Sequence, residues 1–211
     1  MKGGPALSHL GLRKGVGFLG LALPVVLALG KFLLDGGGIQ GSLSGYYYTV
    51  MRDYFVGSNC ATATLLLCYR YRREDGYLSA ALAASAVGLA LFPTNPPGVA
   101  GLTAGQSAAG GVHLVCSTLY FLGQAYFCFA VFTRTDPGSV PTPRKLQRNI
   151  VYRVSGIAIV VCLVLIAVAN QLLTKELRDQ FHPVFWLESV AVWAFSVCWL
   201  IKGRALFLKD T

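Results

Sequence analysis

The sequence predicts an all-α fold, a polytopic transmembrane bundle of about six helices with both ends of the chain in the cytoplasm. Of its 211 residues, 55% are hydrophobic and only 13% are charged, whereas roughly a quarter of a soluble domain is charged. Apolar runs approaching twenty residues recur along the chain, and such runs are long enough to cross a membrane as helices. They are continuous rather than alternating, which favours helices over a barrel.

Six segments have this character and make residues 1–211 a single integral membrane domain. The predicted spans cover about residues 15–34, 54–71, 77–93, 111–133, 150–173 and 184–201. The first run is long and has no clean cleavage site, so we interpret it as a span and not as a signal peptide. The third span is short and rich in Ala, Ser and Gly, which predicts close packing inside the bundle.

Lys and Arg are unevenly distributed between the segments that connect these spans. With the N-terminus in the cytoplasm, the inner segments hold fourteen of the 18 basic residues and the outer segments hold four. This bias is typical of cytoplasmic loops and predicts that both termini lie inside. The Pro-rich segment 134–145 is then a cytoplasmic linker. The net charge is +9. Because the basic residues lie in short loops, where they set the orientation of the protein in the membrane, nucleic acid is not an expected partner.

The less common polar residues collect at the predicted outer surface. Arg52 and Asp53 open the second span, Asn59 follows on the same helix face as Arg52, His113 opens the fourth span, and Glu188 lies inside the sixth. Ionisable groups at membrane depth are costly and are functional candidates by default. We interpret Glu188, His113 and Asp53 as candidate acid–base groups, and Arg52 and Asn59 as candidate ligand contacts.

A polar stripe runs along the fourth span. His113, Ser117, Tyr120 and Gln124 follow an i, i+4, i+7, i+11 spacing, which places them on one helix face. In a membrane this face must turn toward protein or water. With Tyr48, from the loop before the second span, these residues are expected to line an outward-facing pocket.

Each of these residues also has a purely structural interpretation, and the sequence leaves both open. Arg52 and Asp53 can lie at headgroup level, and the tyrosines at 46–48 can form an interfacial aromatic belt. His113 can be a packing histidine that is hydrogen-bonded across helices. Glu188 can be a structural carboxylate, with His113 or Arg52 as its expected partner.

No strong catalytic motif is present, and no cofactor is indicated. The sequence has no G-x-S-x-G, H-E-x-x-H or P-loop pattern, and none of its six cysteines forms a C-x-x-C pair. Asp53, His113 and Glu188 together have side chains suited to a metal ion. Three ligands from three helices have no spacing that sequence can check.

Two passages carry a resemblance to known proteins. "SGYYYTVMRDYFVG" and "FWLESVAVWAFSVCWLIKG" resemble a family of uncharacterised bacterial multi-pass membrane proteins over nearly the whole chain. The arrangement is also similar, more distantly, to damage-regulated autophagy modulators and GPI-anchor lipid-remodelling proteins. Those have about six spans, a His that opens the fourth and a Glu in the last, matched here by His113 and Glu188. This second resemblance implies lipid handling in the membrane.

The sequence therefore predicts an integral protein of the bacterial cytoplasmic membrane. Its outward-facing polar pocket is expected to bind or process a lipid or small amphiphile. Two other functions stay open, a proton-coupled small-solute transporter that uses Glu188 and a non-catalytic membrane scaffold. Enzyme activity, ligand identity and oligomeric state do not follow from the sequence.

Overall fold

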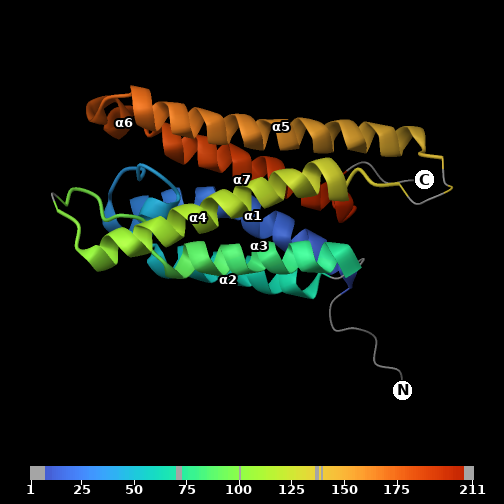
Figure 1. Ribbon diagram of the computed structural model, residues 1–211, viewed down its shortest axis with the longest axis horizontal. Coiled ribbons are helices and arrows are strands. Elements are labelled where there is room, and N and C mark those ends of the chain that lie inside the picture. The colour runs from blue at the N-terminus through green and yellow to red at the C-terminus, as the bar shows by residue number, and fades with distance from the viewer. Residues whose placement is uncertain (1–7, 70–72, 100, 136–137, 139, 207–211) are drawn as a thin grey trace, which may run out of the picture.

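The computed structural model describes residues 8–69, 73–99, 101–135, 138 and 140–206, and these residues form helices and no strand. This agrees with the predicted all-α class. The long helices (Figure 1) are α1 (His9–Asp35), α2 (Arg52–Cys68), α3 (Arg73–Leu91), α4 (Ala104–Tyr126), α5 (Pro143–Leu172) and α7 (Pro183–Lys202). The shorter segments are the 3₁₀ helix η1 (Ser44–Tyr48), the π-helical turn η2 (Phe127–Val131) and α6 (Lys175–Phe181).

The long helices alternate in direction, so the bundle has two different ends (Figure 1). We call one the loop end, which carries residues 36–51, 92–103 and 173–182. The other is the terminal end, where α1 begins and α7 ends. Which end faces the cytoplasm remains a prediction from the Lys and Arg distribution. Of the residues used for that prediction, Lys2, Arg70, Arg72 and Lys209 lie outside the described residues.

Four helices of the described chain are long and apolar enough to cross a membrane: α1, α4 together with η2, α5 and α7. The other two long helices are shorter or less apolar. α2 has 17 residues, and the apolar part of α3 covers Asp75–Leu91. By length and composition, four of the described helices are therefore suited to cross a membrane, and six complete spans remain a prediction.

Each long helix packs against two others. Going around the bundle, the order is α1, α2, α3, α4, α5, α7 and back to α1, with only a weak direct contact between α4 and α7. A closed ring of six helices has an interior that all of them can face. Side chains from α1, α2, α4 and α7 meet in this interior, and the candidate site lies there.

Local capping signals explain why two helices begin earlier than the hydropathy pattern predicts. α4 begins at Ala104 because Thr103 accepts the Gln106 N–H and Gln106 in turn caps the Thr103 N–H, which is a capping box. α5 begins at Pro143, inside the segment interpreted as a linker, because Thr142 caps the helix and a proline is favoured at the first helical position. The predicted spans begin at 111 and 150 because the prediction uses only the first residues of the apolar runs.

Two helices carry local irregularities. Pro24 has no N–H to give in α1, and at this turn the Trp193 indole Nε1–H of α7 donates to the Leu21 carbonyl at 3.1 Å. In η2, the Phe132 N–H reaches back five residues to the Phe127 carbonyl, 2.9 Å away, which widens the end of α4. Neither the π-helical turn nor α6 is predicted by the sequence pattern.

Glycines allow the helices to approach closely, as the composition of the third span predicts. A Cβ added at Gly88 of α3 would collide with the Cys116 sulfur of α4, and one at Gly20 of α1 would collide with the Ser196 hydroxyl of α7. Small residues at such positions let helix backbones pack closely. They bring the helices around the interior near enough for their polar side chains to share one cavity.

Candidate functional site

A cavity lies inside the helix ring, and it extends from two loop residues that cover it at the loop end past the middle of the helices. Leu43 and Ser44 form its roof, and α1, α2, α4 and α7 form most of its walls. Its volume, taken as the space open to the centre of a water molecule, is about 50 Å³. One water molecule needs roughly 10–15 Å³ of such space, so the cavity holds a few waters or one small polar group.

The lining contains both polar and apolar side chains. The apolar residues, called here the apolar wall, include Leu23 of α1, Phe55 of α2, and Val192 and Phe195 of α7. The polar side chains at the cavity are Ser44, Ser58, Asn59, Thr62, Ser117, Tyr120, Gln124, Glu188 and Ser196. Such a mixed lining suits a ligand that has both polar and apolar parts.

Five residues proposed from the sequence therefore come together around one cavity. Asn59 projects from α2, Ser117, Tyr120 and Gln124 from α4, and Glu188 from α7. Three of the four residues of the predicted polar stripe therefore line the cavity, whereas the fourth, His113, does not and contacts the loop residue Ser44 instead. The functional role assigned to them remains a prediction.

Two polar atoms at this cavity have no hydrogen-bond partner within the described part of the chain, the Ser117 hydroxyl oxygen and the Gln124 side-chain carbonyl oxygen. Gln124 is only 1% exposed. A buried polar group without a partner costs about 1–3 kcal/mol. Water or the polar part of a ligand in the cavity would remove that cost.

Glu188 lies at the upper wall of the cavity and binds the loop rather than a cation. Its Oε2 accepts the backbone N–H of Leu43 at 2.6 Å. Among the described residues, no Lys, Arg or His forms an ion pair with it. The expected pairing of Glu188 with His113 or Arg52 is thus wrong, because the loop lies between them and supplies a backbone donor first.

His113 joins the loop to the third turn of α4. Its Nδ1 lies 2.8 Å from the Phe92 carbonyl oxygen, and its Nε2 lies 2.9 Å from the Ser44 hydroxyl. A carbonyl oxygen can only accept, so Nδ1 carries a proton. In the neutral ring Nε2 then accepts the Ser44 O–H. Because Glu188 binds Leu43 and His113 binds Ser44, two adjacent loop residues connect α7 with α4.

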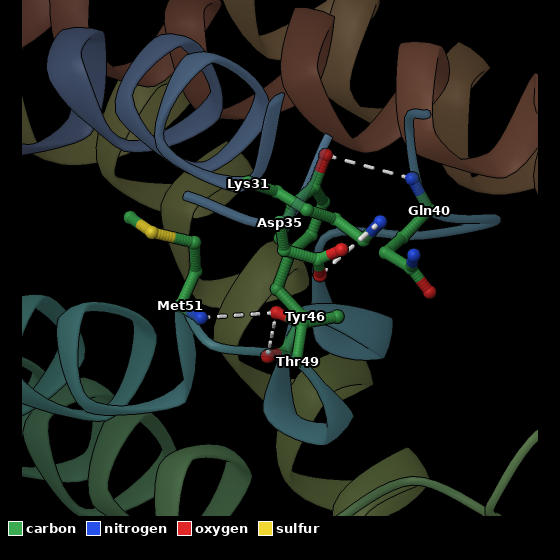
Figure 2. Close-up of polar contacts among 6 residues, drawn as sticks. All are labelled: Lys31, Asp35, Gln40, Tyr46, Thr49 and Met51. Carbon is green, nitrogen blue, oxygen red and sulfur yellow. Dashed lines mark hydrogen bonds and ion pairs between the residues drawn. The ribbon is translucent and has the colours of Figure 1, made fainter. Parts of the chain in front are cut away.

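Internal contacts give the covering loop a defined shape. Figure 2 shows the Gln40 N–H directed at the Tyr46 phenol oxygen, 3.5 Å away, and the Thr49 hydroxyl donating to the Tyr46 carbonyl at 2.8 Å. The Met51 N–H in turn donates to the Thr49 hydroxyl at 3.1 Å. Tyr46 is fully buried, and burial raises the pKa of its phenol, so it remains a neutral packing residue.

Arg52, Asp53 and Tyr48 do not line the cavity, contrary to their predicted positions. Arg52 is exposed at the first turn of α2, where its guanidinium donates to the Tyr47 hydroxyl at 2.9 Å and lies over the Tyr47 ring. Asp53 is exposed beside it. The Tyr48 hydroxyl donates to the Thr94 carbonyl at 2.6 Å. These side chains lie at the end of the bundle, beyond the roof of the cavity. Arg52 therefore does not line the cavity, although it is predicted to share a helix face with Asn59, which does.

The structure does not support the metal site that the sequence allowed. Across the described ranges, no three His, Cys, Asp or Glu side chains gather where one ion could bind them. Asp53 is at the surface, whereas His113 is buried and already hydrogen-bonded through both ring nitrogens. Asp53, His113 and Glu188 therefore do not form one ligand set.

Sequence reasoning did not assign four of the polar groups of this cavity to the site: Ser44, Ser58, Thr62 and Ser196. Ser196 lies eight residues after Glu188 on the same helix, with Val192 midway, and this i, i+4, i+8 spacing could have placed it at the cavity. Ser44 had no comparable signal, because its position depends on how the loop folds back over the bundle.

Comparison of the chain with protein-family models, with curated proteins and with solved structures finds no match. The functional argument therefore rests on the cavity and its contacts.

Proposed function

We propose that this protein is an integral membrane protein that binds the polar part of a lipid or small amphiphile in the cavity beneath its covering loop. The observation that carries the proposal is the pair of unsatisfied polar atoms, on Ser117 and Gln124, in a cavity formed by helices apolar enough to cross a membrane. Buried polar groups are normally hydrogen-bonded, so unpaired groups at a cavity favour a bound polar partner.

The size of the cavity supports a ligand that enters only in part. About 50 Å³ accommodates a small polar group, such as a hydroxyl-bearing or ester-bearing portion of a headgroup. The apolar lining residues Leu23, Phe55 and Val192 give the less polar part of such a group apolar contacts inside the helix ring. An amphiphile can therefore place its polar portion against Gln124 while its chains stay in apolar surroundings.

The expected setting is a bacterial cytoplasmic membrane, with the covering loop on its outer side. The Lys and Arg distribution supports this orientation. Single cysteines in a background that lacks the native ones test it. A membrane-impermeant reagent added to intact cells should modify Cys at Ser107, at the loop end, and leave Cys at Val140 unmodified. Modification of position 140 alone would reverse the orientation.

Lipid retention after purification tests the proposed function. The protein is purified in mild detergent, and the lipids bound to it are measured by native mass spectrometry. Gln124→Leu keeps the side-chain size and removes the unpaired acceptor, so bound lipid should fall several-fold. Gln171→Leu changes an exposed residue of α5 in the same way and should leave lipid retention unchanged. Equal retention in both variants, or no lipid on the unaltered protein, contradicts the proposal.

A further inference from the structure

The Ser44–His113 contact has the geometry of a nucleophile and its base. The Ser44 hydroxyl lies 2.9 Å from His113 Nε2, although the two residues are 69 positions apart in the chain. A serine becomes nucleophilic when an adjacent base can accept its proton, and this requires about 2.6–3.2 Å between the two heavy atoms. The covering loop and α4 together satisfy that requirement.

A third group orients the base. The Phe92 carbonyl accepts the proton on His113 Nδ1 at 2.8 Å, which leaves the lone pair of Nε2 directed at Ser44. In nucleophile–base pairs the base is usually held in this way by a further acceptor. His113 is only 6% exposed, so its ring is held within the protein in this tautomer.

The pair opens onto the cavity. Ser44 is half-buried and belongs to the cavity lining, so its oxygen is accessible from the space assigned above to a lipid headgroup. The bond from the Leu43 N–H to Glu188 holds the neighbouring loop residue in place. Asn59, on the same cavity, donates one amide hydrogen to the Phe55 carbonyl.

We propose that Ser44 and His113 form a catalytic pair that transfers an acyl group from an ester-linked lipid. This inference rests on the proposed function, because it assumes that the lipid ester occupies the cavity. The substrate class is an acyl ester whose carbonyl lies beside Ser44, with its chain along the apolar wall.

The first half of the reaction forms an acyl-enzyme. The Ser44 oxygen bonds to the ester carbonyl carbon as His113 Nε2 takes the hydroxyl proton. The tetrahedral intermediate then collapses, the bond from the carbonyl carbon to the alkoxy oxygen breaks, and His113 returns its proton to that oxygen. The products are an alcohol and an acyl ester on Ser44.

The second half restores the serine. Water or another alcohol gives its proton to His113 Nε2 as its oxygen attacks the acyl carbon. The bond from that carbon to the Ser44 oxygen breaks, and Ser44 recovers the proton from His113. Hydrolysis or acyl transfer results, depending on the acceptor, and no metal or redox partner is consumed in either case.

A purely structural role for the same hydrogen bond makes a different prediction. A bond that only holds the loop on α4 needs an acceptor at position 113, not a base. His113→Gln supplies an amide oxygen that can accept the Ser44 O–H but cannot take its proton. This variant separates the two roles, and its melting temperature in detergent reports on folding.

The test is covalent labelling by a fluorophosphonate, which reacts with activated serines. Purified protein in lipid nanodiscs should gain a phosphonyl adduct on the peptide containing Ser44. Ser44→Ala should abolish this adduct, and His113→Gln should slow its formation by about 100-fold or more, the usual contribution of a general base. Ser42→Ala removes a hydroxyl of the same loop that caps the Gly45 N–H and should be labelled like the unaltered protein.

Two results would overturn the proposal. One is folded, unaltered protein that gains no adduct on Ser44, and the other is His113→Gln protein that is labelled as fast as the original. Lipid retention separates this failure from failure of the proposed function. Absence of the adduct while lipid remains bound removes only the acyl-transfer step, whereas absence of bound lipid in the same preparations removes the binding function.

Discussion

The two ends of the bundle both carry buried polar groups, but they use them differently. At the terminal end the groups are charged and bind protein atoms: Lys145 and Lys202 both donate to the Phe132 carbonyl, at 2.8 and 3.3 Å, and Arg134 pairs with Asp75 at 2.8 Å. Beneath the loop the groups are mostly neutral and surround a cavity. Among the described residues, unpaired buried polar atoms also occur toward the terminal end, such as the Ser79 hydroxyl and the Trp199 indole nitrogen, so Ser117 and Gln124 are distinguished by their position at the cavity beneath the loop.

The terminal end also explains the π-helical turn. η2 widens the end of α4, and the Phe132 carbonyl that follows it accepts two lysines. The rings of Phe127 and Phe132 pack against Trp199, with centroids 5.7 and 5.1 Å away. The π-helical turn is thus held by hydrogen bonds from lysines and by packed aromatic rings. These contacts indicate that the terminal end stabilises the fold.

The largest expected effect concerns this structural end. Asp75 is 3% exposed and its carboxylate bonds Arg134, so Asp75→Asn should lower the free energy of unfolding by about 2–4 kcal/mol. Thermal unfolding in detergent measures it. The matched control is Asp179→Asn, which removes the fully exposed partner of Lys175 in α6 and should leave the melting curve unchanged. If Asp75→Asn protein that is still folded gained less fluorophosphonate adduct on Ser44 than the unaltered protein, the two ends of the bundle would not have separate roles.

The next effect concerns packing near the loop end. Gly88→Leu forces a side chain against Cys116 and should cost about 1–3 kcal/mol of stability. Gly57→Leu, in α2, places the same side chain in open space and provides the control for helix propensity. Equal melting temperatures for the two variants would show that α3 and α4 are not in close contact.

A smaller effect is expected at Glu188, because it accepts a backbone N–H and does not form an ion pair. Glu188→Gln keeps an acceptor for Leu43, so the stability loss should be about 1 kcal/mol, the difference between a charged and a neutral hydrogen bond. Glu188→Leu leaves the Leu43 N–H unpaired and should cost more, about 1–3 kcal/mol. A large loss in the Gln variant that a second change at a basic residue restores would instead identify an ion pair.

The smallest effect is expected at Arg52. Its contacts are an exposed hydrogen bond and a cation–π contact with Tyr47, so Arg52→Ala should change stability by less than about 1 kcal/mol. Lipid retention and the Ser44 label should not change. Loss of lipid retention or of the Ser44 label in this variant would show that Arg52 takes part in the site, contrary to its position in the structure.

The parts of this account that sequence could predict are those set by local spacing. Apolar runs predict the long helices, and the spacing of Ser117, Tyr120 and Gln124 predicts a shared face because helix periodicity is local. The start of α4 was also encoded locally, in the Thr103–Gln106 capping box. Hydropathy alone did not reveal it.

The remaining features depend on contacts between distant segments. Ser44 reaches His113 only because the loop folds back over the ring, and Arg52 leaves the site because its side chain turns to Tyr47 beyond the roof. The π-helical turn depends on lysines and aromatic rings from α5 and α7. Single-helix patterns carry no information about such contacts.

A structure of the protein purified from native membranes, at a resolution that resolves lipid headgroups, tests the central claim most directly. The account predicts a bound amphiphile with a polar atom within hydrogen-bond distance of the Gln124 side-chain oxygen or the Ser117 hydroxyl. Its apolar chain should lie along the wall that contains Phe55 and Val192. A cavity filled only by rearranged side chains, with lipid confined to the outer surface of the helix ring, would contradict the account.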